Sequence, residues 1–421
     1  MARPPRGRPR RPSKRRDDLT EIFEAPAPTR PTPKAKPQKP APKAPAVDPV
    51  FTLSDRFEIL AICAPGQESA LCDELTQQGF ANPTAIAGGA TVMGGWADVW
   101  RANLNLRGAA RILARLGSFP AAHLAQLDKR AHRVPWADIL PQGVQVRVEA
   151  SCHKSKIYHQ KAAAQRVETA LKDCIGAQID PEAALCIKLR IDQDICTLSI
   201  DTSGEALHKR GIKQAVGKAP MRENMAALIL RSCGYTAGEA LYDPMCGSGT
   251  FVLEAAEISA GLQPGRARRF AFEWVRGFDA NAFAALRASA PAGDRPAPVF
   301  FGSDRDGGAI KSSNANADRA GVADLCQFTC ASVSDIAAPD VPPGLVVINP
   351  PYGMRIGERR PLFALYGTMG RVLRERFRGW RVGIVCPDAG LIRAMELPFL
   401  PQPQQIMHGG IRLGLYQTKP L

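Results

Sequence analysis

The segment Asn349-Pro350-Pro351-Tyr352 contains residue types that can hold a planar amine while it is alkylated. The Asn349 side-chain oxygen and the Pro350 carbonyl can each accept one N–H bond, which favours a pyramidal nitrogen with an exposed lone pair. Pro351 closes the turn, and Tyr352 can stack on the face of a base, as aromatics do with an unpaired nucleotide. By itself the segment is equally consistent with a plain turn after a strand, here the apolar run 344–348.

This arrangement suits the exocyclic amine of guanine or adenine. The lone pair of such an amine is delocalised into the ring, so the amine is a poor nucleophile until its geometry is changed. A methyl donor with a positively charged sulfur is already activated, and positioning and electrostatics should then dominate the rate. The chemistry requires no metal.

A glycine-rich turn lies about a hundred residues earlier in the chain. A short strand, 240–242, leads into DPMCGSGT at 243–250, and a helical pattern follows. This order is how an α/β sheet receives a nucleotide-like ligand. No Lys follows the second glycine, as a phosphate loop requires, so a ligand without polyphosphate, such as S-adenosylmethionine, fits better. We expect cofactor contacts from Asp243, Pro244, Met245, Cys246, Gly247, Gly249 and Thr250.

The motifs DPMCGSGT and NPPYG, in this order, resemble the class I S-adenosylmethionine-dependent methyltransferases that modify exocyclic amines. More narrowly, the chain from Leu207 onward is similar to the THUMP-bearing RNA guanine-N2 methyltransferases, which include the bacterial enzymes for large-subunit ribosomal RNA. The narrower resemblance is carried by LHKRG at 207–211, AP at 219–220, FAFE at 270–273, GSD at 302–304 and NAN at 314–316. KSKIYH at 154–159 is similar to the THUMP signature of that family.

The cofactor needs a carboxylate for its ribose hydroxyls at the end of the next strand. Asp304 and Asp279 compete for this role. We choose Asp304, because it ends the better strand pattern, a helical run from 309 to 320 follows it, and the GSD element of the family aligns there. Asp279 is then a surface residue of an inserted segment, and Asp306 is placed to stabilise the start of the next helix.

The contact to the adenine of the cofactor is less well defined. Many relatives carry an acidic residue after the following strand, whereas this chain has Ser332, with Asp335 three residues later. The Ser332 hydroxyl or a backbone amide could take the place of the carboxylate.

The expected architecture has four parts. Residues 1–50 form a disordered tail rich in Pro, Lys and Arg, and residues 56–110 a small ferredoxin-like α+β region. Residues 111–205 form a THUMP-like α+β domain that binds RNA. From 206 to 421, strand and helix patterns alternate, which predicts a Rossmann-like, mostly parallel sheet of the class I methyltransferase type.

Basic residues upstream of the glycine turn could present RNA to the site. The cluster Lys154, Lys156, His159, Lys161 and Arg166 adjoins the THUMP-like signature, and Lys209 and Arg210 lie near the junction with the catalytic region. Each alone is more often a solvated surface charge. Grouped, they could hold phosphates and position RNA without reading its sequence.

Composition agrees with a polyanionic partner. The formal net charge is +15 and the pI is about 9.5, which favours nucleic acid. Residues 1–46 hold 13 Lys and Arg against 4 acidic residues, and 12 of the 36 prolines. Such a segment has too little apolar surface to order itself. It could tether RNA or simply act as a solubilising tail.

Several protein classes are disfavoured. No apolar region follows the N-terminal arginines as in a secretory signal, and no run approaches the ~18 apolar residues of a membrane span. The eleven cysteines include no C-x-x-C pair, so we expect reduced, buried thiols in a cytoplasmic protein without a metal site. We also expect the protein to be monomeric.

Three functions stay open. The first is RNA guanine-N2 methylation, with ribosomal RNA preferred over transfer RNA. The second is adenine-N6 or glutamine-N5 methylation by the same NPPY chemistry. The third is a non-catalytic RNA-binding assembly factor, which the intact motifs disfavour.

Overall fold

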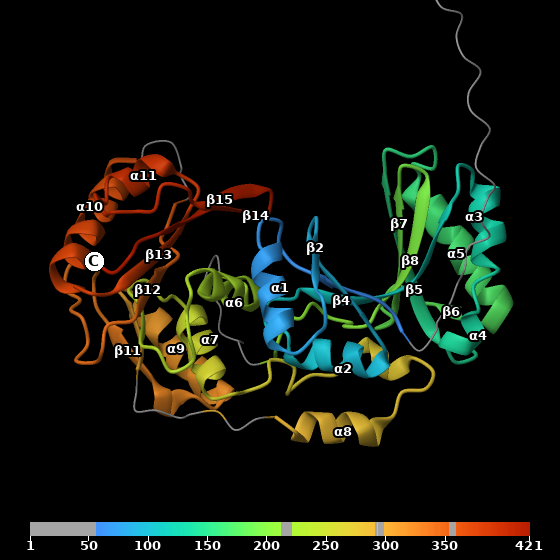
Figure 1. The fold of residues 1–421 in the computed structure, drawn as a ribbon, viewed down its shortest axis with the longest axis horizontal. Helices are drawn as coiled ribbons and strands as arrows, with labels where there is room; N and C mark the ends of the chain where they lie inside the picture. The colour runs from blue at the N-terminus through green and yellow to red at the C-terminus, as the bar shows by residue number, and fades with distance from the viewer. Residues whose placement is uncertain (1–55, 212–220, 291–292, 294–298, 353–358) are drawn as a thin grey trace, which may run out of the picture. The chain divides into compact units, whose positions relative to one another are not determined.

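The computed structural model describes residues 56–211, 221–290, 293, 299–352 and 359–421. The expected basic tail, residues 1–50, lies outside the described residues. The described chain forms two β-sheets, one from residues 57–201 and one from residues 241–417 (Figure 1). No described helix is long and apolar enough to cross a membrane.

The first sheet begins with a βαββαβ unit whose strands lie in the order β2-β3-β1-β4, which is the ferredoxin-like arrangement. Its strands are β1 (Phe57–Ile62), β2 (Thr84–Ile86), β3 (Gly89–Gly94) and β4 (Arg111–Pro120), and its helices are α1 (Glu68–Gln77) and α2 (Trp96–Asn105). The burial of β1 alternates residue by residue, as expected for a strand with one face on the core.

The same sheet continues through the THUMP-like region in the order β4-β8-β7-β5-β6. Figure 1 shows α3 and α5 beside β5, β7 and β8. The elements of this region are α3 (Leu124–Ala131), α4 (Trp136–Ile139), β5 (Gln145–His153), α5 (Gln160–Ile175), β6 (Gln178–Ile179), β7 (Cys186–Asp192) and β8 (Ile195–Asp201).

The expected domain boundary after residue 110 falls just before β4, a strand that belongs to the ferredoxin-like unit. β4 pairs with β1 through Arg111–Ala114 and with β8 from Leu113 to Pro120. One ten-residue strand therefore belongs to both units. Alternation along a strand predicts which face is buried but not which two strands lie beside it.

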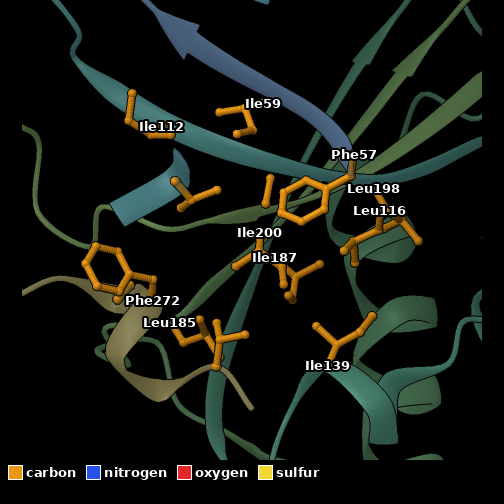
Figure 2. Packing of buried hydrophobic residues seen from close by; sticks show 14 of the residues in the cluster. Phe57, Ile59, Ile112, Leu116, Ile139, Leu185, Ile187, Leu198, Ile200 and Phe272 are labelled. Atoms are coloured by element: carbon orange, nitrogen blue, oxygen red, sulfur yellow. The ribbon is translucent and has the colours of Figure 1, made fainter. Parts of the chain in front are cut away.

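A single hydrophobic core underlies this first sheet. Figure 2 shows Phe57 and Ile59 of β1 near Ile187 of β7 and Ile200 of β8. Phe272, from the second half of the chain, enters the same core and is fully buried. The two halves therefore share apolar packing.

The second sheet has the order β11-β10-β9-β12-β13-β15-β14, and β15 runs in the opposite direction to the other described strands of this sheet. The chain moves outward from β9 to β10 and β11 and then returns to β12, so the topological switch point lies between β9 and β12. Its strands are β9 (Leu241–Asp243), β10 (Phe300–Asp304), β11 (Cys326–Cys330), β12 (Leu345–Ile348), β13 (Arg381–Cys386), β14 (Gln404–His408) and β15 (Ile411–Gln417).

Helices cover both faces of this sheet, which confirms the Rossmann-like expectation. One face packs on α6 (Glu223–Ser232), α7 (Thr250–Ser259) and α9 (Gly307–Ala320), and the other on α10 (Arg359–Arg376) and α11 (Ala389–Arg393). Residues 331–344, all described, form no helix between β11 and β12. A cavity of about 570 Å³ remains on that part of the sheet, between Phe301, Gln327 and Asp335.

The segment between α7 and β10 packs against the first sheet. It contains the short helices η1 (Ala271–Trp274) and α8 (Ala280–Ala288). Phe272 and Phe283 lie edge to face with ring centroids 5.0 Å apart, and both approach Trp100 of α2. The FAFE element at 270–273 therefore packs in this aromatic cluster and forms no strand of the second sheet.

Candidate active site

The glycine turn and the NPPY segment meet at the switch point of the second sheet. β9 lies between β10 and β12, and all three are parallel, so their carboxyl ends share one edge. Asp243 ends β9, Asp304 ends β10, and Asn349 follows β12. Two strand spacings, about 10 Å, separate the outer two strands. Ligands of open α/β sheets bind at this position.

The turn from Asp243 to Thr250 is held by its own backbone and by α9. Gly249 precedes α7 with a φ of +82°, and a Cβ there would lie 3.2 Å from the Ser313 hydroxyl. That hydroxyl donates to the Gly247 carbonyl at 2.9 Å, and the Asn316 amide donates to the Ser248 carbonyl at 3.1 Å. Sequence reasoning missed Ser313, and it quoted Asn316 for the resemblance without giving it a role.

Gly247 marks the open side of the turn. Its φ is +54°, and a Cβ added there would meet no described atom within 4 Å. Gly247 and Met245 are half-buried, whereas Pro244, Cys246 and Thr250 are buried. Burial raises the pKa of the Cys246 thiol, which disfavours the reactive thiolate form.

Asp243 is a buried carboxyl group of the site. It is 2 % exposed, and its carboxylate accepts from the Met245 amide at 3.0 Å. Burial raises the pKa of Asp243 to about 8, the amide bond partly opposes this, and the nearby Asp304 adds to the rise. A cationic ligand beside this carboxyl would lower its pKa and favour its ionised form.

Asp304 has the position expected for a ribose contact. It lies at the end of the strand next to β9, and its carboxylate accepts from the Gly247 amide at 3.1 Å and from the Asp306 amide at 3.0 Å. Asp279 is instead exposed and caps α8 by accepting from the amides of Asn281 and Ala282. The choice of Asp304 therefore agrees with the strand order, and Asp306 caps α9 as expected.

Ser332 lies just beyond β11, at the same edge. The preceding residue, Ala331, donates its amide to the Asp304 carbonyl at 3.0 Å. The Ser332 hydroxyl is bonded to that of Ser334 at 3.1 Å. Ser332 thus follows a residue that is bonded to the backbone of Asp304, and its role toward adenine stays a prediction.

Asn349 has an unused acceptor. Its Oδ1 is buried, and no donor among the described residues reaches it. An unpaired buried acceptor costs about 1–3 kcal/mol, so this atom calls for a partner such as a water, an ion or a bound ligand. The side chain of Tyr352 is half-buried in the same region.

The NPPY backbone is supported from α10 and β13. The Tyr366 hydroxyl donates to the Pro351 carbonyl at 3.3 Å and lies 3.4 Å from the Cys386 thiol. Tyr366 is fully buried. Sequence reasoning missed it, because a tyrosine in an amphipathic helix is ordinarily a core residue.

The basic cluster of the THUMP-like region is exposed. Lys154, Lys156 and His159 lie between β5 and α5, and Lys161 and Arg166 lie on α5. Lys209 is also exposed, and it pairs with Glu205 at 3.3 Å. These six residues are exposed, and their role as phosphate contacts stays a prediction.

The prediction that Arg210 contacts RNA was wrong. Arg210 is 4 % exposed and pairs with Glu254 at 2.5 Å and with Glu257 at 3.1 Å. A guanidinium that is buried and neutralised in this way has no donor facing solvent RNA. The two glutamates lie one helical turn apart on α7, which the sequence could have indicated as a site for a buried cation.

Comparisons with known proteins agree with this geometry. Residues 210–407 match the family model described as the RMKL-like methyltransferase domain, and residues 58–113 match the RlmL ferredoxin-like domain. The THUMP-like region, 111–205, is matched by neither family model over most of its length.

Relatives resemble the chain across both sheets. The ribosomal RNA large subunit methyltransferase K/L of Syntrophotalea carbinolica is 34% identical over 85% of this chain and 51% of its own length. The chain therefore spans about half the length of the curated relatives it matches. The structure of SMU.472 complexed with SAH covers 88% of this chain and 99% of its own (27% identity, TM-score 0.79). A predicted N6-adenine-specific DNA methylase of Listeria monocytogenes covers 87% and 97% (29% identity, TM-score 0.78).

Proposed function

We propose that this protein transfers a methyl group from S-adenosylmethionine to the exocyclic N2 amine of a guanine in 23S ribosomal RNA. The observation that carries the proposal is the buried Asn349 Oδ1, which no donor of the described residues reaches. It lies at the sheet edge shared with the glycine turn and Asp304. A buried acceptor there matches the N–H donor of an amine.

The residues of the turn fit the cofactor. Gly247 leaves space on the ligand side, Asp304 can accept from ribose hydroxyls, and Asp243 offers a carboxyl whose ionised form a positive charge would stabilise. When bound, S-adenosylmethionine supplies an electrophilic methyl group on a positive sulfur. Ser332 is proposed to face its adenine.

The NPPY segment orients the amine. The Asn349 Oδ1 and the Pro350 carbonyl accept its two N–H bonds, which draws the nitrogen lone pair out of the ring plane. Tyr352 stacks on the base, while Tyr366 fixes the Pro351 carbonyl and so the path of the segment. These groups are held before substrate arrives, which is how preorganised sites lower a barrier.

Ribosomal RNA is the preferred substrate because the relatives named for large-subunit ribosomal RNA methylation align over both sheets. The exposed cations of the THUMP-like region would hold its phosphates. Adenine-N6 methylation is the second candidate, favoured by the name of the Listeria monocytogenes structure. Both reactions would use the same NPPY contacts, so the base must be identified by its product.

The deciding experiment supplies purified protein with labelled S-adenosylmethionine and with RNA from cells that lack the gene. We expect label in ribosomal RNA, and N2-methylguanosine after digestion to nucleosides. Asn349→Ala should lower the rate by roughly 10²–10³, as removal of one preorganised hydrogen-bonding group does elsewhere, while RNA binding is retained.

The product distinguishes the alternatives. N6-methyladenosine would exclude the guanine assignment, and label in transfer RNA alone would exclude the ribosomal one. If no RNA is labelled, the proposal itself is rejected, whether the label is found in a protein glutamine or nowhere.

A further inference from the structure

Tyr158 is exposed although it lies next to a buried residue. Its side chain is 71 % exposed, the highest value among the exposed large hydrophobic residues of the described chain, whereas Ile157 is 5 % exposed and belongs to the core. The Tyr158 ring lies 4.3 Å from the His159 ring, at an angle of 38°. Ile157 thus anchors the segment, and Tyr158 presents a free aromatic face.

The loop that carries Tyr158 is held at several points. The Ser155 hydroxyl donates to the His153 carbonyl at 2.9 Å and accepts from the Asp194 amide at 2.9 Å. The Lys156 amide donates to the Asp194 carboxylate at 2.7 Å. These bonds tie the loop to the turn between β7 and β8, so the aromatic side chain projects from a preorganised backbone.

Three exposed lysines lie close to Tyr158 in the sequence. Lys154, Lys156 and Lys161 are exposed and take part in no ion pair within the described part of the chain. The acidic side chain of Asp192 is paired with His153 at 3.0 Å and with Arg190 at 2.8 Å. Asp194 is engaged with the Lys156 backbone. A phosphate approaching this loop would meet free ammonium groups on either side of Tyr158 in the sequence.

We propose that Tyr158 is a stacking platform for an unpaired base of the substrate RNA, with the three lysines holding the flanking phosphates. The proposal rests on the RNA substrate of the proposed function and adds the form of RNA recognised. An exposed aromatic face among cations is the combination that binds single-stranded nucleic acid with little sequence preference. A paired base is already stacked inside its helix and cannot use the ring.

The test measures binding of the full chain to two RNA probes by fluorescence anisotropy, one a single-stranded 12-mer and the other a duplex of the same length. Tyr158→Ala should weaken binding of the single strand roughly 5- to 150-fold, the range that corresponds to removal of one stacked base. Binding of the duplex should change less than about twofold.

Two control variants separate stacking from other interactions. Tyr158→Phe keeps the ring without the hydroxyl and should bind the single strand as the wild type does. Lys154→Ala should weaken both probes and reduce the salt dependence, whereas Tyr158→Ala should leave the salt dependence unchanged. Circular dichroism and S-adenosylmethionine affinity verify that each variant is folded.

The inference is overturned if Tyr158→Ala binds the single strand like the wild type, or if both probes lose affinity equally. An equal decrease with Tyr158→Phe would also overturn it, since a hydroxyl contact would then explain the effect. RNA methylation by the wild type would still support the proposed function in these cases. If the wild-type chain neither binds nor methylates RNA, the proposed function fails as well.

Discussion

At the scale of single residues, the Asp304 carboxylate accepts two backbone hydrogen bonds and lies at the edge of the second sheet where we expect the cofactor. Asp304→Ala should weaken S-adenosylmethionine binding by about 1–3 kcal/mol, because the ribose hydroxyls lose a charged acceptor. Calorimetric titration measures this directly. Asp279→Ala is the matched control, since it removes only a helix cap, worth ~0.5–2 kcal/mol of stability. Weaker cofactor binding in the control, with no change at Asp304, would contradict the assignment.

Asp243 provides a pH-dependent test. Its pKa is raised from 3.8 to about 8 in the folded protein, mainly by burial. Between these values the folded state keeps a proton that the unfolded state has lost, so the contribution of Asp243 to the free energy of unfolding falls as pH rises from about 4 to about 8. Urea titrations across this window should therefore show a decline that Asp243→Asn reduces. Identical pH profiles for the two proteins would show that Asp243 ionises normally.

At the scale of elements, a buried ion network joins the first sheet to α7. Arg107, Arg210 and Arg266 surround Glu254 and Glu257. Burial opposes ionisation of Glu257, but the three guanidinium groups hold its pKa below the usual value. The charges compensate one another only while Arg210 stays packed against Glu254 and Glu257 of α7.

Arg210→Ala should therefore lower the free energy of unfolding by about 3–5 kcal/mol, because it leaves buried carboxylates short of a partner. Urea denaturation provides the measurement. The neighbouring Lys209→Ala removes only an exposed pair and should cost at most about 1 kcal/mol. If the two variants were equally stable, Arg210 would contribute no more to stability than an exposed ion pair does.

At the scale of the whole molecule, the candidate RNA-binding residues and the candidate catalytic residues lie in different sheets. Lys154 and Lys156 follow β5 of the first sheet, whereas Asn349 follows β12 of the second. Substituting both lysines by Ala should weaken RNA binding and lower the log–log salt slope by about 0.7–0.9 for each phosphate that is no longer neutralised. Filter binding over a salt series tests this, and cofactor affinity should stay constant.

A matched double variant uses Lys129 and Lys172, which are exposed on α3 and at the far end of α5. Substituting these two by Ala removes the same formal charge from the same region. An equal change in slope from this control would mean that only net charge matters and that the lysines before α5 do not touch the RNA.

The sequence by itself determined the chemistry-bearing parts of the second sheet. A strand, a glycine turn and a helix are local features, so DPMCGSGT predicted its own conformation. Asp304 could be chosen over Asp279 because the strand before it and the helix after it are read from neighbouring residues. Asn349 and Tyr352 needed no distant partner to be recognised as a motif.

Only the tertiary structure decided what depends on residues far apart in the chain. β4 pairs with both β1 and β8, and its own pattern specifies neither neighbour. Arg210 reads as a surface cation until Glu254 and Glu257 are brought against it from more than forty residues away. Tyr366 acquires a role only when folding places its hydroxyl beside the Pro351 carbonyl. Burial and pairing are properties of contacts, and residue types alone do not specify which contacts form.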